Sequence, residues 1–148
     1  MKKTPAPAFW DSSALVLLTC QQSLSAKARA AHRIHFRLHV WWGTRIECHS
    51  ALRRLAREGD LTGKEEPQAF SSLGKLAGQW VEILPTEEIR QQAERLLSLH
   101  LLRAADALQL AAAQVWCNGF PKGRQFVCAD KNLSEAATKE GFTVTFLR

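Results

Sequence analysis

The 148-residue sequence predicts a single α/β domain, built on a mostly parallel sheet with helices on both faces. Three observations lead to this class. Short apolar runs alternate along the chain with helical segments of ten or more residues, the order that parallel βαβ units produce. The apolar fraction of 46% and the charged fraction of 23% are those of an ordinary globular protein. A chain of this length buries about 68–70% of its unfolded surface in one core.

Five short runs have strand character, because they are apolar, β-branched or aromatic and end at turn residues. The run AFW comes first, LHVWW is stopped by Gly43-Thr44, and VEIL is stopped by Pro85. QFVCA precedes the turn Asp130-Lys131-Asn132, and FTVTFL follows the last helix. These strands are expected at residues 8–10, 38–42, 81–84, 125–129 and 142–147.

The segments between the strands have helical spacing of apolar residues and recognisable ends. Thr44 followed by Glu47 has the spacing of a capping box, and Gly59 is a natural stop for the helix that begins there. The run LRAADALQLAAAQVW is the most apolar helix and is expected to be buried on most sides. Helices are expected at residues 12–21, 23–35, 44–58, 86–100, 102–116 and 133–140, and a further helix has Pro67 near its start and Leu73, Leu76 and Ala77 on one face.

The charge balance indicates a polyanionic or acidic partner. The formal net charge is +6, and part of this excess lies in KARAAHRIHFR, residues 27–37. This stretch carries four basic residues and two histidines but no acid. Contact with nucleic acid and the solvated face of a helix are both open explanations for it.

The cysteines and the N-terminus indicate a cytoplasmic protein. The cysteines lie far apart without a CxxC pair, which fits reduced thiols better than a disulfide framework or a zinc site. The start MKKTPAPAFWD is interrupted by two prolines and Asp11, so we do not expect a signal peptide. No run approaches the roughly 18 apolar residues of a membrane span. We therefore expect one cytoplasmic domain over residues 1–148, with no membrane partner.

Four acids fall at strand-to-helix junctions of the predicted sheet. Asp11 follows the first strand, and Glu47 lies in the first turn of the helix after the second. Asp106 lies in the first turn of the most apolar helix, and Asp130 follows the fourth strand. The carboxyl ends of parallel strands share one edge, where ligands bind. Each acid alone can also be explained as a helix cap or a favourable charge at a helix N-terminus, but Asp11 and Asp106 interrupt apolar runs.

Four carboxylates at one edge predict a hard divalent cation. They would repel one another unless a positive charge lay between them. None of the four positions is His or Cys, which favours Mg²⁺ or Mn²⁺ over zinc. Such an ion suits hydrolysis of a phosphodiester, because it activates water and neutralises the leaving oxygen. The basic surface would then bind the phosphate backbone.

Four segments, in this order, resemble the signature segments of PIN-domain ribonucleases: FWDSSAL, VWWGTRIECHSAL, LRAADALQLAAA and FVCADKNLSEAA. The likeness is greatest to the VapC-like toxins of bacterial type II toxin–antitoxin modules and covers residues 8–148. It implies a PIN-like, three-layer α/β/α sandwich with a mostly parallel sheet of about five strands. It also implies Mg²⁺- or Mn²⁺-dependent cleavage of RNA, often a structured RNA such as tRNA, a cognate antitoxin that blocks the acidic pocket, and frequently a homodimer.

The resemblance also assigns the candidate site residues. Asp11, Glu47, Asp106 and Asp130 match the family's catalytic, metal-binding acids, and Ser13 matches the small polar residue beside the first acid. Ser12 stands where Thr is common, and this departure removes no acid. Six basic residues, in the stretch 27–37 or beside the acids, are candidate contacts to substrate phosphate or offset the negative charge of the pocket. They are Arg29, Arg33, Arg37, Arg45, Arg103 and Lys131.

Other classes fit less well. A haloacid-dehalogenase-type phosphatase needs a second acid two residues after the first, and position 13 is Ser. A response-regulator receiver needs an acidic pair near the first strand, which is not present. We therefore expect a metal-dependent endoribonuclease that acts as a toxin. A PIN-type nuclease in RNA processing or decay, or a non-catalytic basic nucleic-acid-binding module, are the alternatives.

Overall fold

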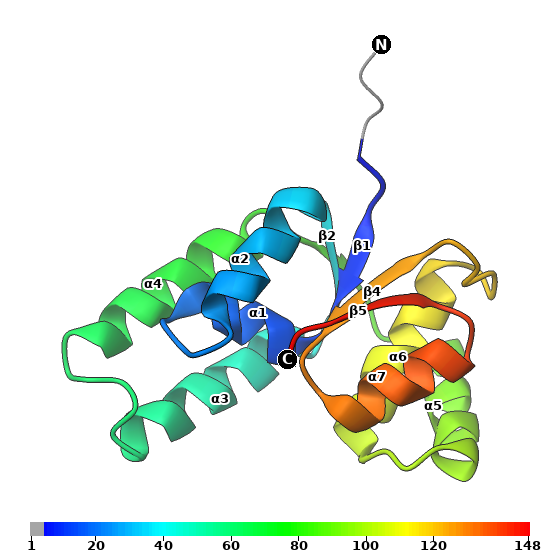
Figure 1. Ribbon diagram of the computed structural model, residues 1–148. Coiled ribbons are helices and arrows are strands. Elements are labelled where there is room, and N and C mark those ends of the chain that lie inside the picture. Colours follow the sequence, from blue (N-terminus) through cyan, green and yellow to red (C-terminus); the bar gives the residue numbers. More distant parts are fainter. Residues whose placement is uncertain (1–4) are drawn as a thin grey trace.

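The computed structural model describes residues 5–148; the charged start MKKT lies outside the described residues. Its core is a five-stranded sheet (Figure 1). The strands are β1 (Ala8–Trp10), β2 (Leu38–Trp41), β3 (Val81–Ile83), β4 (Gln125–Cys128) and β5 (Thr143–Phe146). The helices are α1 (Ser12–Thr19), α2 (Ser25–Ile34), α3 (Thr44–Arg57), α4 (Glu65–Ala77), α5 (Glu87–Leu99), α6 (Ala104–Trp116) and α7 (Lys131–Lys139).

The strands are arranged in the order β3-β2-β1-β4-β5, and every neighbouring pair is parallel. The chain therefore starts in the middle of the sheet, winds outward to β3, and returns to the other side of β1 as β4. All five carboxyl ends lie at one edge, with the change of winding direction beside β1, where α/β proteins bind ligands. The parallel sheet of about five strands is confirmed.

Two groups of helices cover the two faces of the sheet (Figure 1). The side chains of β1 alternate between them: Ala8 and Trp10 belong to the core beneath α1 to α4, and Phe9 belongs to the core beneath α5 to α7. All three side chains are fully buried, as expected for a central parallel strand. This arrangement confirms the predicted α/β/α sandwich.

The N-terminal cap of α3 differs from the prediction. Gly43, not Thr44, occupies the N-cap position of α3, and no side chain caps it. Thr44 is instead the buried first residue of the helix, and its Oγ1 accepts a hydrogen bond from Gln109 Nε2 at 2.9 Å. The predicted capping box is wrong because the Glu47 carboxylate is bound by Ser12 and Gln109 rather than by the cap.

The cysteines are free thiols, as the sequence predicted, and three of them are buried. The buried cysteines are Cys48, Cys117 and Cys128, and Cys20 is partly exposed. None of the helices within residues 5–148 combines the length and apolar character needed to cross a membrane.

Candidate active site

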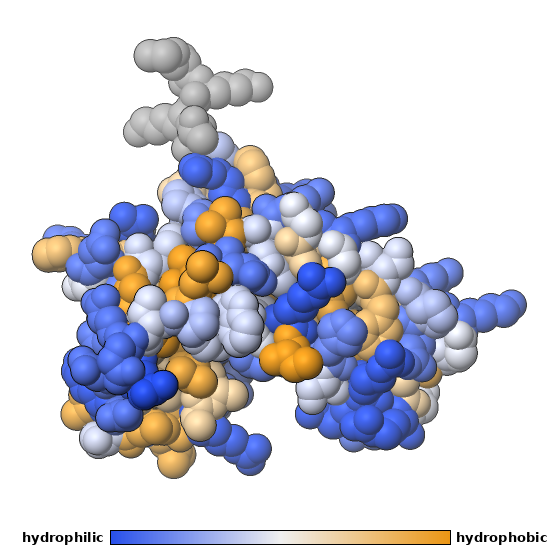
Figure 2. All heavy atoms as spheres, turned by 180° about the vertical axis from the view of Figure 1, so that it is seen from behind, coloured by the Kyte–Doolittle hydropathy of each residue, from blue (hydrophilic) through white to orange (hydrophobic). Residues whose placement is uncertain are grey.

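A cavity of about 960 Å³ opens at the carboxyl edge of the sheet, between the two groups of helices. The space-filling view from behind shows the molecule hollowed between these groups (Figure 2). The four acids singled out in the sequence all line this cavity, although they are up to 119 residues apart in the chain: Asp11, Glu47, Asp106 and Asp130. We refer to this cavity as the acidic pocket.

Asp11 stands at the junction of β1 and α1, where it is the N-cap of the helix and only 2% exposed. Its Oδ2 accepts hydrogen bonds from the Ser13 backbone N–H, at 3.1 Å, and from the Ser13 hydroxyl. Ser13 Oγ in turn accepts from the Ala129 backbone N–H at 2.8 Å, which ties the acid to the end of β4. Burial raises the pKa of Asp11 to about 7, against the effect of the Ser13 bonds.

Glu47 reaches the pocket from the first turn of α3. Ser12 Oγ donates to its Oε1 at 2.9 Å, and Gln109 Nε2 lies 3.2 Å and 3.3 Å from its two oxygens. The amide of Gln109 is fully buried and also donates to Thr44, so a single side chain links α6 to α3. Burial raises the pKa of Glu47, and these hydrogen bonds partly offset that rise.

Asp106 and Asp130 enter the pocket from the starts of α6 and α7. Asp130 is the N-cap of α7 and accepts a hydrogen bond from the Leu133 backbone N–H at 2.8 Å. Burial raises the pKa of Asp106, and the nearby Asp130 charge raises it further, whereas Arg103 lowers it. The two acids therefore lie close enough to repel each other.

The acidic pocket gathers carboxyl groups without a basic partner in the described part of the chain. Among residues 5–148, none of the four carboxylates takes part in a salt bridge. Besides burial, the charges of Glu47 and Asp106 raise the pKa of Asp11, and the charge of Asp106 raises that of Glu47. A bound cation would relieve this repulsion and favour the ionised form of the carboxyl groups.

The donor atoms of the pocket fit a hard divalent cation. Its polar lining supplies carboxylate and hydroxyl oxygens but no His or Cys, which favours Mg²⁺ or Mn²⁺ over zinc. In the part of the chain that the structure describes, no three Asp, Glu, His or Cys side chains already form a ready-made metal cluster. We therefore expect the carboxylates to move closer together when they bind an ion.

The six basic residues proposed from the sequence lie in different places. Arg103, the residue before α6, lines the acidic pocket. Arg45 and Lys131 are exposed and do not belong to its lining. The other three lie on α2 or just after it, also outside the lining: Arg29, Arg33 and Arg37.

Sequence reasoning missed three residues of the site. Ser12 and Gln109 bind Glu47, and Arg54 lines the pocket. Two of them share a helix face with a predicted acid, since Gln109 follows Asp106 by three residues and Arg54 follows Glu47 by seven. That spacing is the signal that could have identified them.

Two solved structures resemble this chain over nearly its whole length. PAE2754 from Pyrobaculum aerophilum matches with a TM-score of 0.62 and 21% sequence identity, over 97% of this chain and 92% of that chain. FitAcB from Neisseria gonorrhoeae matches with a TM-score of 0.61 and 17% identity, over 93% of this chain and 95% of that chain. No family model and no curated protein matches the sequence. The fold is PIN-like, and the resemblance that the four motifs predicted is confirmed at the level of the fold.

Proposed function

We propose that this chain is a Mg²⁺- or Mn²⁺-dependent endoribonuclease. The observation that carries the proposal is the convergence, in one pocket of a PIN-like sheet, of four carboxylates that form no ion pair with any residue of the described chain. Keeping such charges together without a cation is unfavourable, so their arrangement is best explained by a metal ion. The net charge of +6 despite this acidic pocket leaves the remaining surface basic, which suits a polyanionic substrate.

The residues of the pocket would have different roles in hydrolysis. Asp11, Glu47, Asp106 and Asp130 would hold the divalent ion, which when bound lowers the pKa of water and neutralises charge on the phosphate. Hydrogen bonds from anchored partners fix two of these acids: Ser13 orients Asp11, and Ser12 with Gln109 orients Glu47. Such supporting partners keep metal-binding groups in their working orientation.

Two arginines would position the RNA. Arg54 on α3 and Arg103 before α6 come from the two helix groups that border the pocket. Neither forms an ion pair with a carboxylate in the described chain. The planar guanidinium group binds phosphate oxygens in pairs, so these residues are suited to hold the phosphates on both sides of the cleaved bond.

We further propose that the nuclease acts as the toxin of a toxin–antitoxin pair. This proposal is supported by the resemblance to VapC-like toxins and by the near full-length match to FitAcB. A cognate antitoxin that blocks the acidic pocket and a homodimer are the expected partners. Expression should arrest growth, and coexpression of the adjacent reading frame should restore it. Growth that continues during expression would instead favour a nuclease of RNA processing.

Cleavage of purified RNA tests the proposed activity. The parent protein should cut unfractionated tRNA with Mg²⁺ or Mn²⁺ but not with EDTA, and Asp11→Asn should lose about 10²-fold or more in rate. Asparagine can still accept the Ser13 N–H bond at the N-cap, so the fold should be kept. Asp60→Asn, in the exposed loop after α3, is the matched control. Equal cleavage by Asp11→Asn and the parent would refute the site assignment.

A further inference from the structure

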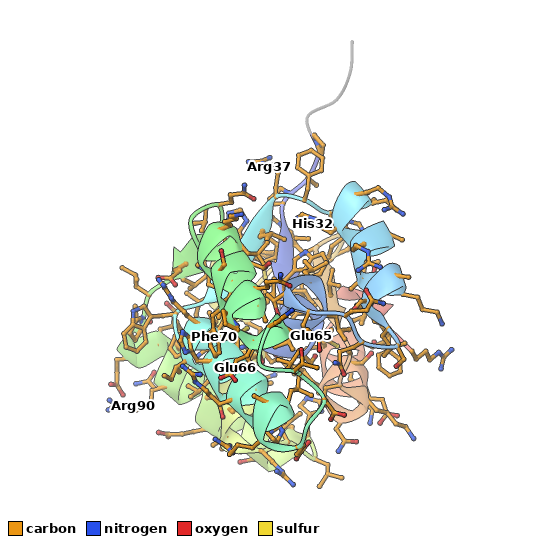
Figure 3. All side chains as sticks on the ribbon, turned by 90° about the vertical axis from the view of Figure 1, so that its left-hand side faces the viewer. His32, Arg37, Glu65, Glu66, Phe70 and Arg90 are labelled. Atoms are coloured by element: carbon orange, nitrogen blue, oxygen red, sulfur yellow. The ribbon has the colours of Figure 1, made fainter. Side chains whose placement is uncertain are left out.

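The amino edge of the sheet, opposite the acidic pocket, brings two arginines together from distant parts of the chain. Ala8 of β1 pairs with Leu38 of β2 on one side and with Gln125 of β4 on the other. Arg37 and Arg124 directly precede these partners, so they stand on either side of the start of β1, about 10 Å apart at two strand spacings. Both side chains are exposed, and Figure 3 shows Arg37 at this end of the molecule.

Contacts with neighbouring groups hold both arginines at this edge. The guanidinium of Arg124 lies 5.2 Å from the centroid of the Trp116 ring, and the His39 ring lies 5.5 Å from the same tryptophan. Arg37 donates to the Pro5 carbonyl at 3.0 Å. Burial lowers the pKa of His39, and the charges of both arginines lower it further. Both arginines therefore lie near His39.

No acid lies in the segments that lead into the five strands. These segments are residues 5–7, 35–37, 78–80, 117–124 and 141–142. The acids that are closest to these segments in the sequence have other partners: Glu82 accepts from Trp80 Nε1 at 3.2 Å, and Glu140 binds His100 at 2.7 Å. In residues 5–148, neither arginine of this edge forms a salt bridge, so their charges face solvent without compensation.

Exposed aromatic rings accompany these charges. Phe36 is 50% exposed and Phe120 is 78% exposed, each within four residues of one of the arginines. The loop that carries Phe120 is shaped by left-handed backbone at Asn118 and Gly119, and a hydrogen bond of 2.8 Å from the Arg124 N–H to the Pro121 carbonyl closes it. Basic side chains that bind the backbone, next to rings on which bases stack, are typical of surfaces that bind single-stranded nucleic acid.

We propose that this basic edge, made of Phe36, Arg37, Phe120, Arg124 and the exposed Lys122 of the same loop, is a second RNA-binding surface. It would hold an unpaired part of a folded RNA while the acidic pocket cuts that RNA. The inference rests on the proposed nuclease function and names its substrate as an RNA large enough to reach both edges. Residue 7 and Asp11 are separated by about 13 Å along β1. An RNA must also pass over a helix layer about 10 Å thick, so its path is on the order of 30 Å. Four stacked nucleotides, at about 3.4 Å each, are too short for that path.

The test compares a large and a small RNA. Arg37→Ser/Arg124→Ser should raise the Kd for unfractionated tRNA, measured by fluorescence anisotropy in EDTA, by about tenfold. The slope of log K against log salt should flatten by about 1.4–1.8, since each lost phosphate contact removes about 0.7–0.9. In the cleavage assay KM for tRNA should rise while kcat stays the same. Cleavage of a tetranucleotide should not change.

Matched variants separate the charge of this edge from net charge and folding. Arg57→Ser/Arg90→Ser removes the same charge elsewhere and should leave Kd within about twofold of the parent. Arg37→Lys/Arg124→Lys keeps the charge and should retain most of the affinity, and Lys122→Glu, at an exposed position, should weaken binding severalfold. The inference would be overturned if Arg37→Ser/Arg124→Ser bound tRNA as tightly as Arg57→Ser/Arg90→Ser does. It would also be overturned if Lys122→Glu bound tRNA as tightly as the parent. Either result would indicate that this edge binds a protein instead. Because RNA binding is measured without metal, the experiment tests the binding surface even if the protein does not cleave RNA.

Discussion

The two edges of the sheet carry opposite charge although the same five strands build both. At the carboxyl edge, the acids are wholly or partly buried, and Asp11, Glu47 and Asp130 accept hydrogen bonds that orient them. At the amino edge, Arg37 and Arg124 are exposed, and the lead-in segments contain no acid. A parallel sheet produces this separation, because residues before every strand collect at one edge and residues after it at the other. Charged residues that precede the strands in the sequence therefore lie at one edge, and those that follow the strands lie at the other.

The difference in burial between the edges matches the difference in their proposed tasks. Burial raises the pKa of Asp11, Glu47 and Asp106, so it disfavours their charged forms, and a bound cation would favour those forms again. The arginines of the amino edge are exposed to water, so they remain solvated until they bind an anionic partner. This difference is consistent with the proposal that one edge cleaves RNA and the other binds it.

The largest effect should come from removing a second acid at the carboxyl edge. Asp106→Asn should lower RNA cleavage by about 10²–10³-fold, and Asp11→Asn/Asp106→Asn should be no worse than either single variant. Groups that act as one unit lose their whole contribution when any one of them is removed. Glu94→Gln, on the exposed face of α5, serves as the control. If the two losses multiplied in single-turnover assays, the acids would not form one site.

The next effect should come from the buried amide that supports Glu47. Gln109→Leu removes the donor that links Glu47 to Thr44, and should lower cleavage by about 10–100-fold, the usual effect of a group that orients a metal-binding acid. Gln114→Leu changes the same residue type on the same helix, but its amide binds Glu140 instead. The control should change thermal stability without changing cleavage per folded molecule. Equal losses in both variants would show a merely structural effect.

Substitutions at the two edges should have different effects on the pH dependence of the protein's stability. Burial raises the pKa of folded Asp11 from an ordinary 3.8 to about 7, so the folded protein holds this proton more tightly than the unfolded chain. The resulting stabilisation is complete below pH 4 and is lost as the pH rises through about 7. We expect the Tm of the metal-free protein to fall between pH 5 and pH 8 by an amount on the order of 5–10 °C.

Asp11→Asn should remove most of this fall in Tm, and Arg37→Ser/Arg124→Ser should leave it unchanged. Saturating Mg²⁺ should raise the Tm of the parent more at pH 8 than at pH 5, because the Asp11 carboxyl, with its pKa of about 7, is largely ionised only at the higher pH. Calorimetric scans at the two pH values measure all of these differences. An identical fall in Asp11→Asn and the parent would show that another group controls the stability.

The smallest effect should mark where the RNA-binding surface ends. Arg29→Ser/Arg33→Ser tests the basic face of α2, next to the amino edge, where both side chains are exposed. We expect the Kd for tRNA to rise only about two- to threefold, with a salt slope flatter by about 1. A loss as large as that of the Arg37 and Arg124 pair would extend the surface along α2. An unchanged slope would leave α2 as a solvated helix.

Sequence reasoning predicted the five strands and the junctions at which the acids stand, because these depend on local residue types. Asp11 and Asp130 could be placed at one edge as soon as the strands before them were taken as parallel. Local patterns also misled at Thr44, where the capping-box spacing was present but the hydroxyl is buried against Gln109. A distant partner competed with the local cap, and no local pattern reveals that partner.

The remaining features depend on the order of the strands in the sheet. Arg37 and Arg124 become neighbours only because β1 lies between β2 and β4, an arrangement that no segment of the sequence specifies alone. The bond from Ser12 to Glu47 likewise depends on how α1 packs against α3. Sequence therefore predicted which residues lie at each edge more readily than which of them touch.

Binding of Mn²⁺ to the RNA-free protein at pH 8, followed by electron paramagnetic resonance, tests the central claim most directly. The parent should bind Mn²⁺, and Mg²⁺ should compete for the same site. Asp11→Asn should weaken binding by about tenfold or more, whereas Arg37→Ser/Arg124→Ser should bind as the parent does. Mn²⁺ affinity that is the same in Asp11→Asn and the parent would contradict a divalent-cation site in the acidic pocket.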